Sequence, residues 1–409
     1  MLKNNWFRAV IGLVVIFVFV GLINFDRIQR FTIVLSLFSP EKIADNFINM
    51  ESIFDVNQIN PAGTAYPLIE DMTLKLPSAF QYKDSTIQVD DYIEYTQTQG
   101  LLVLKSDTIL YESYPSDYLQ NEDFISWSLS KSFVSALMGI AIEKGFVASI
   151  VDPVEKYAPV LKGSGYEGVS IKDVLQMSSG IHFDEDYHKF SSDINRLGRV
   201  FALGSSFDSY VASLDQEREP GTFHHYVSMD TQVAGMVIKG ATGMTLSSFM
   251  ENELWIPLGA EAPSYWLKDS KGMEAAFGGL NCNLRDYGRF GLLYANDGFL
   301  NGSQILTESW VNASTTATEA HLMPGIQDAS SHPFGYGYQW WIPGGDEGDF
   351  MAMGVYSQFI YVDPVNNIVI VKNSSNYHYA VEKRLTTFRH LEFFRAIRSS
   401  ILKQQESEI

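Results

Sequence analysis

The chain has 409 residues, enough for two or three structural units at about 150 residues each. It carries 29 lysines and arginines against 48 aspartates and glutamates, and the net charge of −19 excludes a broad basic surface for nucleic acid. With 46% hydrophobic residues the composition is that of a folded protein. The single cysteine, Cys282, excludes an intramolecular disulfide and a cysteine zinc site, and we interpret it as a buried apolar side chain.

The first predicted element is residues 7–25, which contain fifteen consecutive apolar residues, AVIGLVVIFVFVGLI. As a helix the segment is about 30 Å long, close to the hydrocarbon thickness of a bilayer. Lys3 and Arg8 precede the apolar run and no A-x-A-like site follows it, which favours a signal anchor over a cleaved signal peptide or a core helix. We therefore expect a single-pass protein of the bacterial inner membrane, with residues 1–6 cytoplasmic and the bulk of the chain periplasmic.

Two predicted hairpins lie far apart in the main part of the chain. Residues 26–85 lack a long periodicity and are expected to be a linker that packs on a domain formed by residues 86–409. Within that domain, Leu101–Tyr114 consists of two β-rich runs around a polar turn. Phe359–Ser375 has the same pattern and turns at Pro364–Asn367.

Helical patterns occupy the sequence between these hairpins. Ser128–Lys144 has apolar residues at helical spacing and is followed by Gly145, which predicts a buried helix. Residues 151–259 show helical and loop signals, and residues 381–402 predict an amphipathic C-terminal helix. Strands at both ends of a helical middle indicate one α/β (α+β) fold, with an antiparallel sheet flanked by helices and an all-helical insertion at about 151–259.

The pattern Ser-x-x-Lys occurs at Ser39, Ser128 and Ser400. A catalytic pair needs a helix, which places residues three apart on one face at about 5–6 Å. It also needs burial, because a lysine that loses hydration has a lower pKa and can accept a hydroxyl proton. Only Ser128 begins a strongly apolar helix, so Ser128 is the candidate nucleophile and Lys131 its general base. The structural alternative is an N-cap serine with a surface lysine.

A serine–lysine pair commonly works with a second proton-transfer group that serves the leaving group. Tyrosines followed two residues later by serine or asparagine are Tyr111, Tyr114, Tyr226 and Tyr294. Tyr226 differs from the others because it follows the turn Glu219-Pro-Gly221, which predicts an accessible loop. Tyr226 is therefore the candidate proton shuttle.

Three other patterns are not interpreted as catalytic or binding sites. Gly163–Gly168 matches G-x-G-x-x-G, but no clean strand precedes it and no βαβ series follows. The histidines show no metal-ligand spacing, and the adjacent His224 and His225 would point apart on an extended segment. The acidic run Asp184-Glu185-Asp186 is interpreted as a solvated loop. We therefore expect no metal and no cofactor.

Six sequence segments follow one another in a recognisable order. They are WSLSKSFVSALMGIAIEKG, VSIKDVLQMSSGIHFDEDY, EPGTFHHYVS, AFGGLNCNLRDYGRFG, FGYGYQWW and SQFIYVDP. This order resembles the serine β-lactamase-like superfamily of class C β-lactamases and penicillin-binding proteins, and most of all its 6-aminohexanoate-dimer hydrolase and esterase-type members. The resemblance covers about residues 86 to 400. It implies a β-lactamase/transpeptidase-like fold in which Ser128 accepts the acyl group, Lys131 is the base and Tyr226 is the proton shuttle.

The resemblance also implies substrate contacts. Ser228 takes the place of the family's usual asparagine, as in nylon-oligomer hydrolases, and Tyr187 resembles a substrate-contacting tyrosine of that branch. Gly354, in the third family motif, would contact the substrate. The backbone N–H of Val355 would join that of Ser128 as the oxyanion hole.

That third motif departs from the family pattern. Relatives carry Lys-Thr/Ser-Gly or His-x-Gly, whereas this chain has Ala352-Met353-Gly354 at the corresponding place. Because the cation of the relatives lies near a substrate carboxylate, its replacement by Ala352 favours a neutral ester or amide. The family's Ser-Asp-Asn motif is also missing, since the corresponding sequence is Ser192-Asp193-Ile194.

The sequence therefore predicts a membrane-anchored serine hydrolase that cleaves a small-molecule ester or amide through an acyl-enzyme on Ser128. Two alternatives stay open. One is a DD-peptidase or β-lactamase, which the alanine at position 352 disfavours. The other is an inactive binding protein on the same fold, which Ala352 supports and the intact set of Ser128, Lys131 and Tyr226 opposes.

Overall fold

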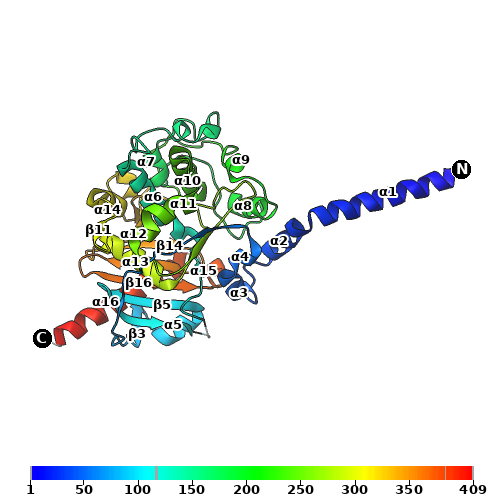
Figure 1. Ribbon diagram of the computed structural model, residues 1–409. Helices are drawn as coiled ribbons and strands as arrows, with labels where there is room; N and C mark the ends of the chain where they lie inside the picture. The colour runs from blue at the N-terminus through cyan, green and yellow to red at the C-terminus, as the bar shows by residue number, and fades with distance from the viewer. Residues whose placement is uncertain (1, 116–117, 383, 408–409) are drawn as a thin grey trace.

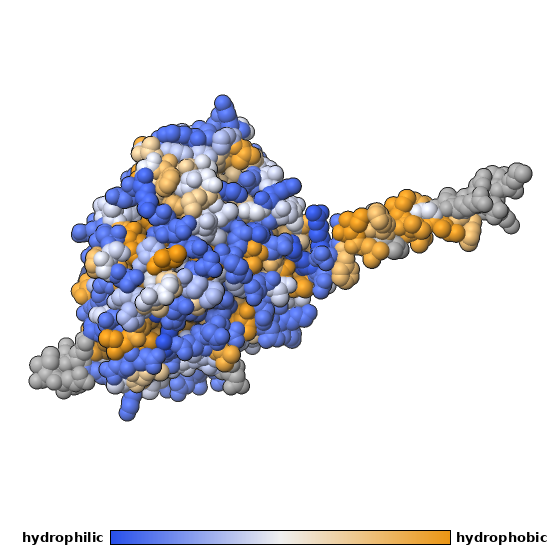
Figure 2. Space-filling model, viewed as in Figure 1, coloured by the Kyte–Doolittle hydropathy of each residue, from blue (hydrophilic) through white to orange (hydrophobic). Residues whose placement is uncertain are grey.

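The computed structural model describes residues 2–115, 118–382 and 384–407. Figure 1 shows sheets and helices gathered in one body, from which helix α1 (Leu2–Ile23) projects. Among the described residues no single helix has the length and apolarity to cross a membrane. Val10–Ile23 and Phe25–Leu35 meet those criteria only as a pair, with a bend of 66° between them. Figure 2 shows apolar side chains along the projecting helix.

An eight-stranded sheet forms the centre of the body, in the order β12-β13-β14-β15-β16-β5-β6-β2. Its strands are β2 (Ile69–Glu70), β5 (Thr98–Lys105), β6 (Thr108–Ser113), β12 (Gly335–Tyr336), β13 (Trp341–Ile342), β14 (Phe350–Gly354), β15 (Gln358–Asp363) and β16 (Ile368–Ser374). Both predicted hairpins are present, as β5–β6 and β15–β16, and β16 pairs with β5. The prediction of one sheet built from distant parts of the chain is confirmed. All pairings are antiparallel except β2–β6 at the edge.

Alternate side chains of the sheet face two separate cores, as the period of two in a strand requires. Leu102 and Leu104 of β5 face the core that contains helices α6 (Ser130–Glu143) and α13 (Leu284–Ala295). Leu101 and Val103 face the core beneath α16 (Arg384–Ser407). The helices α15 (Tyr379–Glu382) and α16 occupy the place of the predicted C-terminal helix. The sheet is therefore the middle layer between two layers of helices.

Helix α6 is the buried helix that the sequence predicts, since its residues from Ser130 to Ala141 are all buried. It begins two residues later than expected, because Ser128 lies in a preceding 3-10 turn, η2 (Trp127–Leu129). The φ of Trp127 is +45°, a left-handed conformation that is strained for a bulky residue. This turn directs the chain abruptly from strand β7 (Phe124–Ile125) into α6.

Residues 151–259 consist of helices and turns and contain no strand. They hold η3 (Val154–Lys156), η4 (Pro159–Leu161), α7 (Ile171–Leu175), α8 (Asp193–Ala202), α9 (Phe207–Val211), α10 (Ser228–Thr242), α11 (Leu246–Met250), the π-helical turn η5 (Glu251–Trp255) and α12 (Ile256–Leu258). Helix α10 is central to this region and packs against α6, α7 and α9. Its first residue, Ser228, therefore lies close to the turn that holds Ser128.

The smaller elements complete the body. A second sheet has the order β1-β8-β9-β7 and consists of β1 (Val56–Ile59), β8 (Ser264–Leu267), β9 (Leu280–Cys282) and β7. Two short hairpins are β3–β4 (Ala79–Tyr82, Ser85–Gln88) and β10–β11 (Phe299–Leu300, Ser303–Gln304). Further helices are α5 (Val89–Tyr95), α14 (Glu308–Thr315) and η6 (Ala320–Leu322). Cys282, in β9, is a buried free thiol as predicted.

Residues 26–85 pack on the body, but they hold more regular structure than a linker. Besides β1 to β3 they contain most of α2 (Phe25–Leu35), and α3 (Ile43–Ile48) and α4 (Met50–Ile53). Strand β1 joins the second sheet and β2 the main sheet. These strands have four and two residues, too few to produce a visible periodicity in the sequence.

An aromatic cluster fastens this N-terminal segment to the middle of the chain. Phe38 stacks on Tyr356 with ring centroids 4.8 Å apart and lies 5.5 Å from the ring of Trp127. Phe47 packs edge-on against Trp127 at 5.3 Å and Tyr356 at 5.5 Å. The N-terminal segment therefore supports both Trp127, which precedes Ser128, and Tyr356, which follows Val355.

Candidate active site

Lys131 lies one helical turn after Ser128, and its side chain is only 1% exposed. Its Nζ donates to Ser128 Oγ at 3.2 Å, to Ser228 Oγ at 3.3 Å and to the carbonyl of Phe277 at 2.5 Å. The three acceptors come from η2, from the start of α10 and from the loop before β9. The structure therefore brings together Ser128, Lys131 and Ser228, which the sequence placed in two distant motifs.

Burial determines the acidity of this amine. It lowers the pKa of Lys131 from its usual range to about 7, while the carboxylates of Glu185 and Asp230 oppose that shift. An amine with such a pKa is about half deprotonated at pH 7, and the neutral form can accept a proton. Lys131 is thus a buried base within hydrogen-bonding distance of a serine hydroxyl, and not a surface charge.

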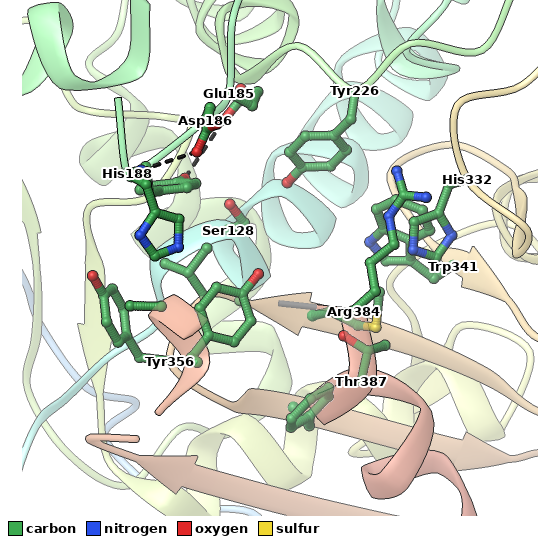
Figure 3. A pocket seen from close by; sticks show the side chains of 17 residues that line it. Ser128, Glu185, Asp186, His188, Tyr226, His332, Trp341, Tyr356, Arg384 and Thr387 are labelled. Carbon is green, nitrogen blue, oxygen red and sulfur yellow. Dashed lines mark hydrogen bonds between the residues drawn. The ribbon is translucent and has the colours of Figure 1, made fainter. Parts of the chain in front are cut away.

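Tyr226 lies in the loop before α10, as predicted, and directs its hydroxyl toward Ser128 (Figure 3). Its ring stacks on that of Trp341 with centroids 5.4 Å apart. Lys131 Nζ also lies 5.4 Å from the centroid of the Tyr226 ring. Desolvation raises the pKa of Tyr226 well above its usual value, and a hydrogen bond with Ser128 opposes the shift. The phenol is therefore protonated at neutral pH and can act as a proton donor.

Glu185 is a site residue that the sequence interpretation missed. The acidic run was expected to be a solvated loop, but Glu185 Oε1 accepts a hydrogen bond of 2.6 Å from the backbone N–H of Ser228. Desolvation raises the pKa of this carboxyl, and the charge of Lys131 and the hydrogen bonds from Ser228 oppose the shift. Its only sequence signal is its position two residues before Tyr187. Glu185 therefore holds the first turn of α10 and supplies a negative charge beside Lys131.

The remaining predicted contact residues lie around the same place. Tyr187 and Val355 line two cavities that meet at Ser128, Gly354 lines the first of them and Ser228 the second. The Tyr187 hydroxyl also faces Glu185 at 3.5 Å. All the residues that the sequence predicts for the site are thus close to one another, although they come from both the sheet and the helical region.

Gly354 shows why the sheet can come so near to the nucleophile. A Cβ atom at this position would lie 2.4 Å from the carbonyl oxygen of Ser126, so that only glycine fits. Strand β14 packs against η2 through this contact. The close approach places the backbone of Val355 beside the turn that holds Ser128.

The two cavities differ in their walls. The first has a volume of about 340 Å³ and is lined by Tyr226, His332, Trp341 and Arg384 among others (Figure 3). The second has a volume of about 330 Å³ and a largely apolar lining from the N-terminal segment and α8. Both volumes fall in the range of small-molecule sites.

The first cavity corrects one inference from the sequence. Ala352 is completely buried in β14 and does not line either cavity. However, Arg384, at the start of α16, lines the first cavity and donates to the carbonyl of Ser331 at 2.5 Å. A positive charge therefore reaches this cavity from another element, and the alanine at 352 is not sufficient reason to disfavour an anionic substrate. No sequence pattern indicated that Arg384, at the start of the C-terminal helix, would line this cavity.

Comparisons with known proteins agree with this architecture. The Beta-lactamase family model matches residues 98–392, and the chain belongs to that family. A 6-aminohexanoate-dimer hydrolase from Paenarthrobacter ureafaciens is 28% identical over 330 residues, which are 78% of this chain and 81% of that protein. A candidate D-alanyl-D-alanine carboxypeptidase from Salmonella paratyphi A is 28% identical over 115 residues, 26% of each chain.

A solved structure gives the same result for the fold. A candidate 6-aminohexanoate-dimer hydrolase from Bacillus anthracis superimposes with a TM-score of 0.74 at 22% identity, covering 87% of this chain and 96% of that one. The resemblance that the six ordered motifs indicated is therefore confirmed. The fold is of the β-lactamase/transpeptidase type, with an antiparallel sheet and helices on both faces.

The electrostatic coupling of Lys131 to Glu185 is testable without a substrate. In the full chain, carbon-13 NMR of lysine side chains, assigned with Lys131→Met, should give Lys131 a pKa near 7. Glu185→Gln should lower that pKa further, because the Glu185 carboxylate stabilises the ammonium form. Glu217→Gln is the control, since this carboxylate is half exposed and pairs with His182. A pKa in Glu185→Gln that is unchanged or raised would contradict the assignment.

Proposed function

We propose that this chain is a serine hydrolase that cleaves an ester or amide bond of a small molecule through an acyl-enzyme on Ser128. The observation that carries the proposal is the 3.2 Å contact between Ser128 Oγ and Lys131 Nζ, whose burial lowers the pKa of the amine to about 7. The similarity to a 6-aminohexanoate-dimer hydrolase supports an amide-type substrate. The required steps use only side chains and backbone of this chain, with no cofactor.

In the proposed acylation, neutral Lys131 takes the proton of the Ser128 hydroxyl while Oγ forms a bond to the substrate carbonyl carbon. The backbone N–H groups of Ser128 and Val355 stabilise the oxyanion, and the close packing of β14 on η2 supports this assignment. Tyr226 donates its proton to the leaving group as the bond to that group breaks, and regains a proton from the Lys131 ammonium. Tyr187, Ser228 and Gly354 border the substrate.

In the proposed deacylation, water gives a proton to neutral Lys131 and attacks the acyl carbonyl carbon. The bond to Ser128 Oγ breaks, the serine recovers its proton, and the acid leaves. The sum of both steps is substrate plus water giving an acid and an alcohol or amine, so that no further reactant is needed. Glu185 acts as a positioning residue, because it holds the N–H of Ser228 at 2.6 Å.

A fluorophosphonate probe tests the nucleophile. The full chain should be labelled and Ser128→Ala should not, because the probe reacts with an activated serine hydroxyl. Ser130→Ala is the matched control, since the Ser130 hydroxyl is buried two residues later, at the start of α6, and donates to the carbonyl of Ala276. Equal labelling of the wild type and Ser128→Ala would end the hydrolase proposal and favour a binding protein on the same fold.

The role of Tyr226 predicts a dependence on the leaving group. Tyr226→Phe should lower kcat/KM for alkyl esters and amides by about 100-fold or more, since their leaving groups must be protonated. The loss for 4-nitrophenyl esters should be much smaller, because nitrophenolate departs without a proton. Steady-state kinetics with both series give the comparison. Equal losses for the two series would assign Tyr226 to packing against Trp341 instead.

We also propose that helix α1 anchors the chain in the bacterial inner membrane, with a periplasmic catalytic domain. Supporting features are the exposed apolar side chains of α1, such as Phe17 with 80% of its surface exposed, and the basic residues Lys3 and Arg8 before the apolar run.

Fractionation of cells that express the full chain tests the anchor. The chain should stay in the membrane pellet after an alkaline wash, and protease added to spheroplasts should degrade its domain. Val14→Arg with Phe17→Arg should release it, whereas Val365→Arg, at an exposed position in the β15–β16 turn, should not. Recovery of the unmodified chain in the wash would disprove anchoring.

A further inference from the structure

The two cavities meet at the nucleophile, and their walls distinguish the two halves of a substrate. Ser128, Tyr187 and Val355 line both of them, whereas Tyr226 lines only the first. Under the proposed function, the leaving group must lie on the side of Tyr226, which protonates it. The acyl group therefore extends into the second cavity.

The lining of this second cavity is that of a site for hydrocarbon. Leu197 and Phe201 of α8 line it together with Leu37, Phe38 and Phe54 of the N-terminal segment, and Phe277, whose carbonyl accepts from Lys131, also lines it. The rings of Phe54 and Phe201 stack at 4.4 Å and form part of the wall. Binding to an apolar wall of this kind becomes more favourable with every methylene that the wall removes from water.

The size of the cavity limits the length of the chain. Because a water-sized group occupies ~30 Å³, a volume of about 330 Å³ has room for roughly ten methylene groups. The first cavity, with Glu185, Arg384 and His332 in its wall, suits a polar leaving group. The two cavities together fit an amphiphile with its scissile carbonyl at Ser128.

One wall of the second cavity comes from residues that precede the region matched by the family model. Val34 and Leu35 end helix α2, and Leu37 and Phe38 follow it, whereas the family model starts at residue 98. Helix α2 packs against α8, so these two helices enclose the cavity on the side where α1 leaves the body (Figure 1).

The mouth of the second cavity lies beside these helices. Two of its lining residues, Leu35 and Phe190, are 61% and 72% exposed. The guanidinium of Arg199 lies over the Phe190 ring at 4.0 Å from its centroid. The mouth thus combines exposed apolar surface with a cation, next to the helix that carries the apolar side chains of Figure 2.

We propose that the second cavity is an acyl-chain pocket and that the substrate is an ester or amide of a hydrocarbon acyl chain of roughly ten carbons. This proposal rests on the proposed function, because it needs an acyl-enzyme on Ser128. The polar leaving group occupies the first cavity, and the hydrocarbon enters through the mouth beside Leu35 and Phe190, on the side of α1.

A series of 4-nitrophenyl esters from acetate to decanoate tests the pocket with a constant leaving group. For the full chain, kcat/KM should rise by about tenfold or more from butyrate to decanoate, because each buried methylene adds binding energy. A flat or falling series would overturn the proposal.

Gly198 offers a variant that fills the pocket selectively. It lines the second cavity on α8, and a Cβ at this position would meet no atom within 4 Å. Gly198→Phe should therefore lower kcat/KM for decanoate by about tenfold or more while acetate keeps its wild-type value. Gly198→Ala and Gly63→Phe, an open and exposed position in a loop, are the controls. Equal losses for both esters in Gly198→Phe would contradict the assignment.

The two proposals fail in different ways. If no ester of any length is hydrolysed and no fluorophosphonate labels Ser128, the hydrolase proposal itself fails. If esters are hydrolysed without a dependence on acyl length, only the acyl pocket fails. If the acyl pocket holds, turnover of 4-nitrophenyl decanoate in solution is compared with its turnover within phosphatidylcholine vesicles, which identifies the source of the acyl group. Faster turnover of the embedded ester assigns it to membrane lipid, and faster turnover of the free ester assigns it to a soluble amphiphile.

Discussion

Lys131 has to find hydrogen-bond acceptors in the interior of the protein, and the surrounding structure is arranged to supply them. A buried ammonium without partners would cost several kcal/mol. Ser128, Ser228 and the carbonyl of Phe277 provide the acceptors from three separate segments. The same burial that creates this demand also lowers the pKa of the amine. The geometry of the site and its basicity therefore have one common cause.

The site depends equally on the contact between sheet and helical region. Helix α6 lies between them: its preceding turn contacts β14, and the helix itself packs against α10. Gly354 permits the first contact, and Glu185 fixes the second through the N–H of Ser228. Neither half alone forms the two cavities, because Tyr226 comes from the helical region and Val355 from the sheet.

The sequence predicts the parts with strong local patterns. Both hairpins, the buried helix and the motif around Ser128 have clear periodicity or spacing, and the structure contains them. Strands β1 and β2 are too short to give such a signal, so the segment 26–85 was expected to be a linker. The positions of Glu185 and Arg384 in the site were not predicted for another reason. Their roles depend on which distant residues they face, and a local sequence pattern does not contain that information.

The aromatic cluster around Phe38 and Phe47 gives the N-terminal segment a second structural role. It packs on Trp127 and Tyr356, which have φ values of +45° and +60° and flank the two backbone amides assigned to the oxyanion. Such conformations persist only when neighbouring atoms hold them. A shortened protein that starts at the family boundary, residue 98, would lack this support. The structural support of the site therefore begins well before the region that the family model matches.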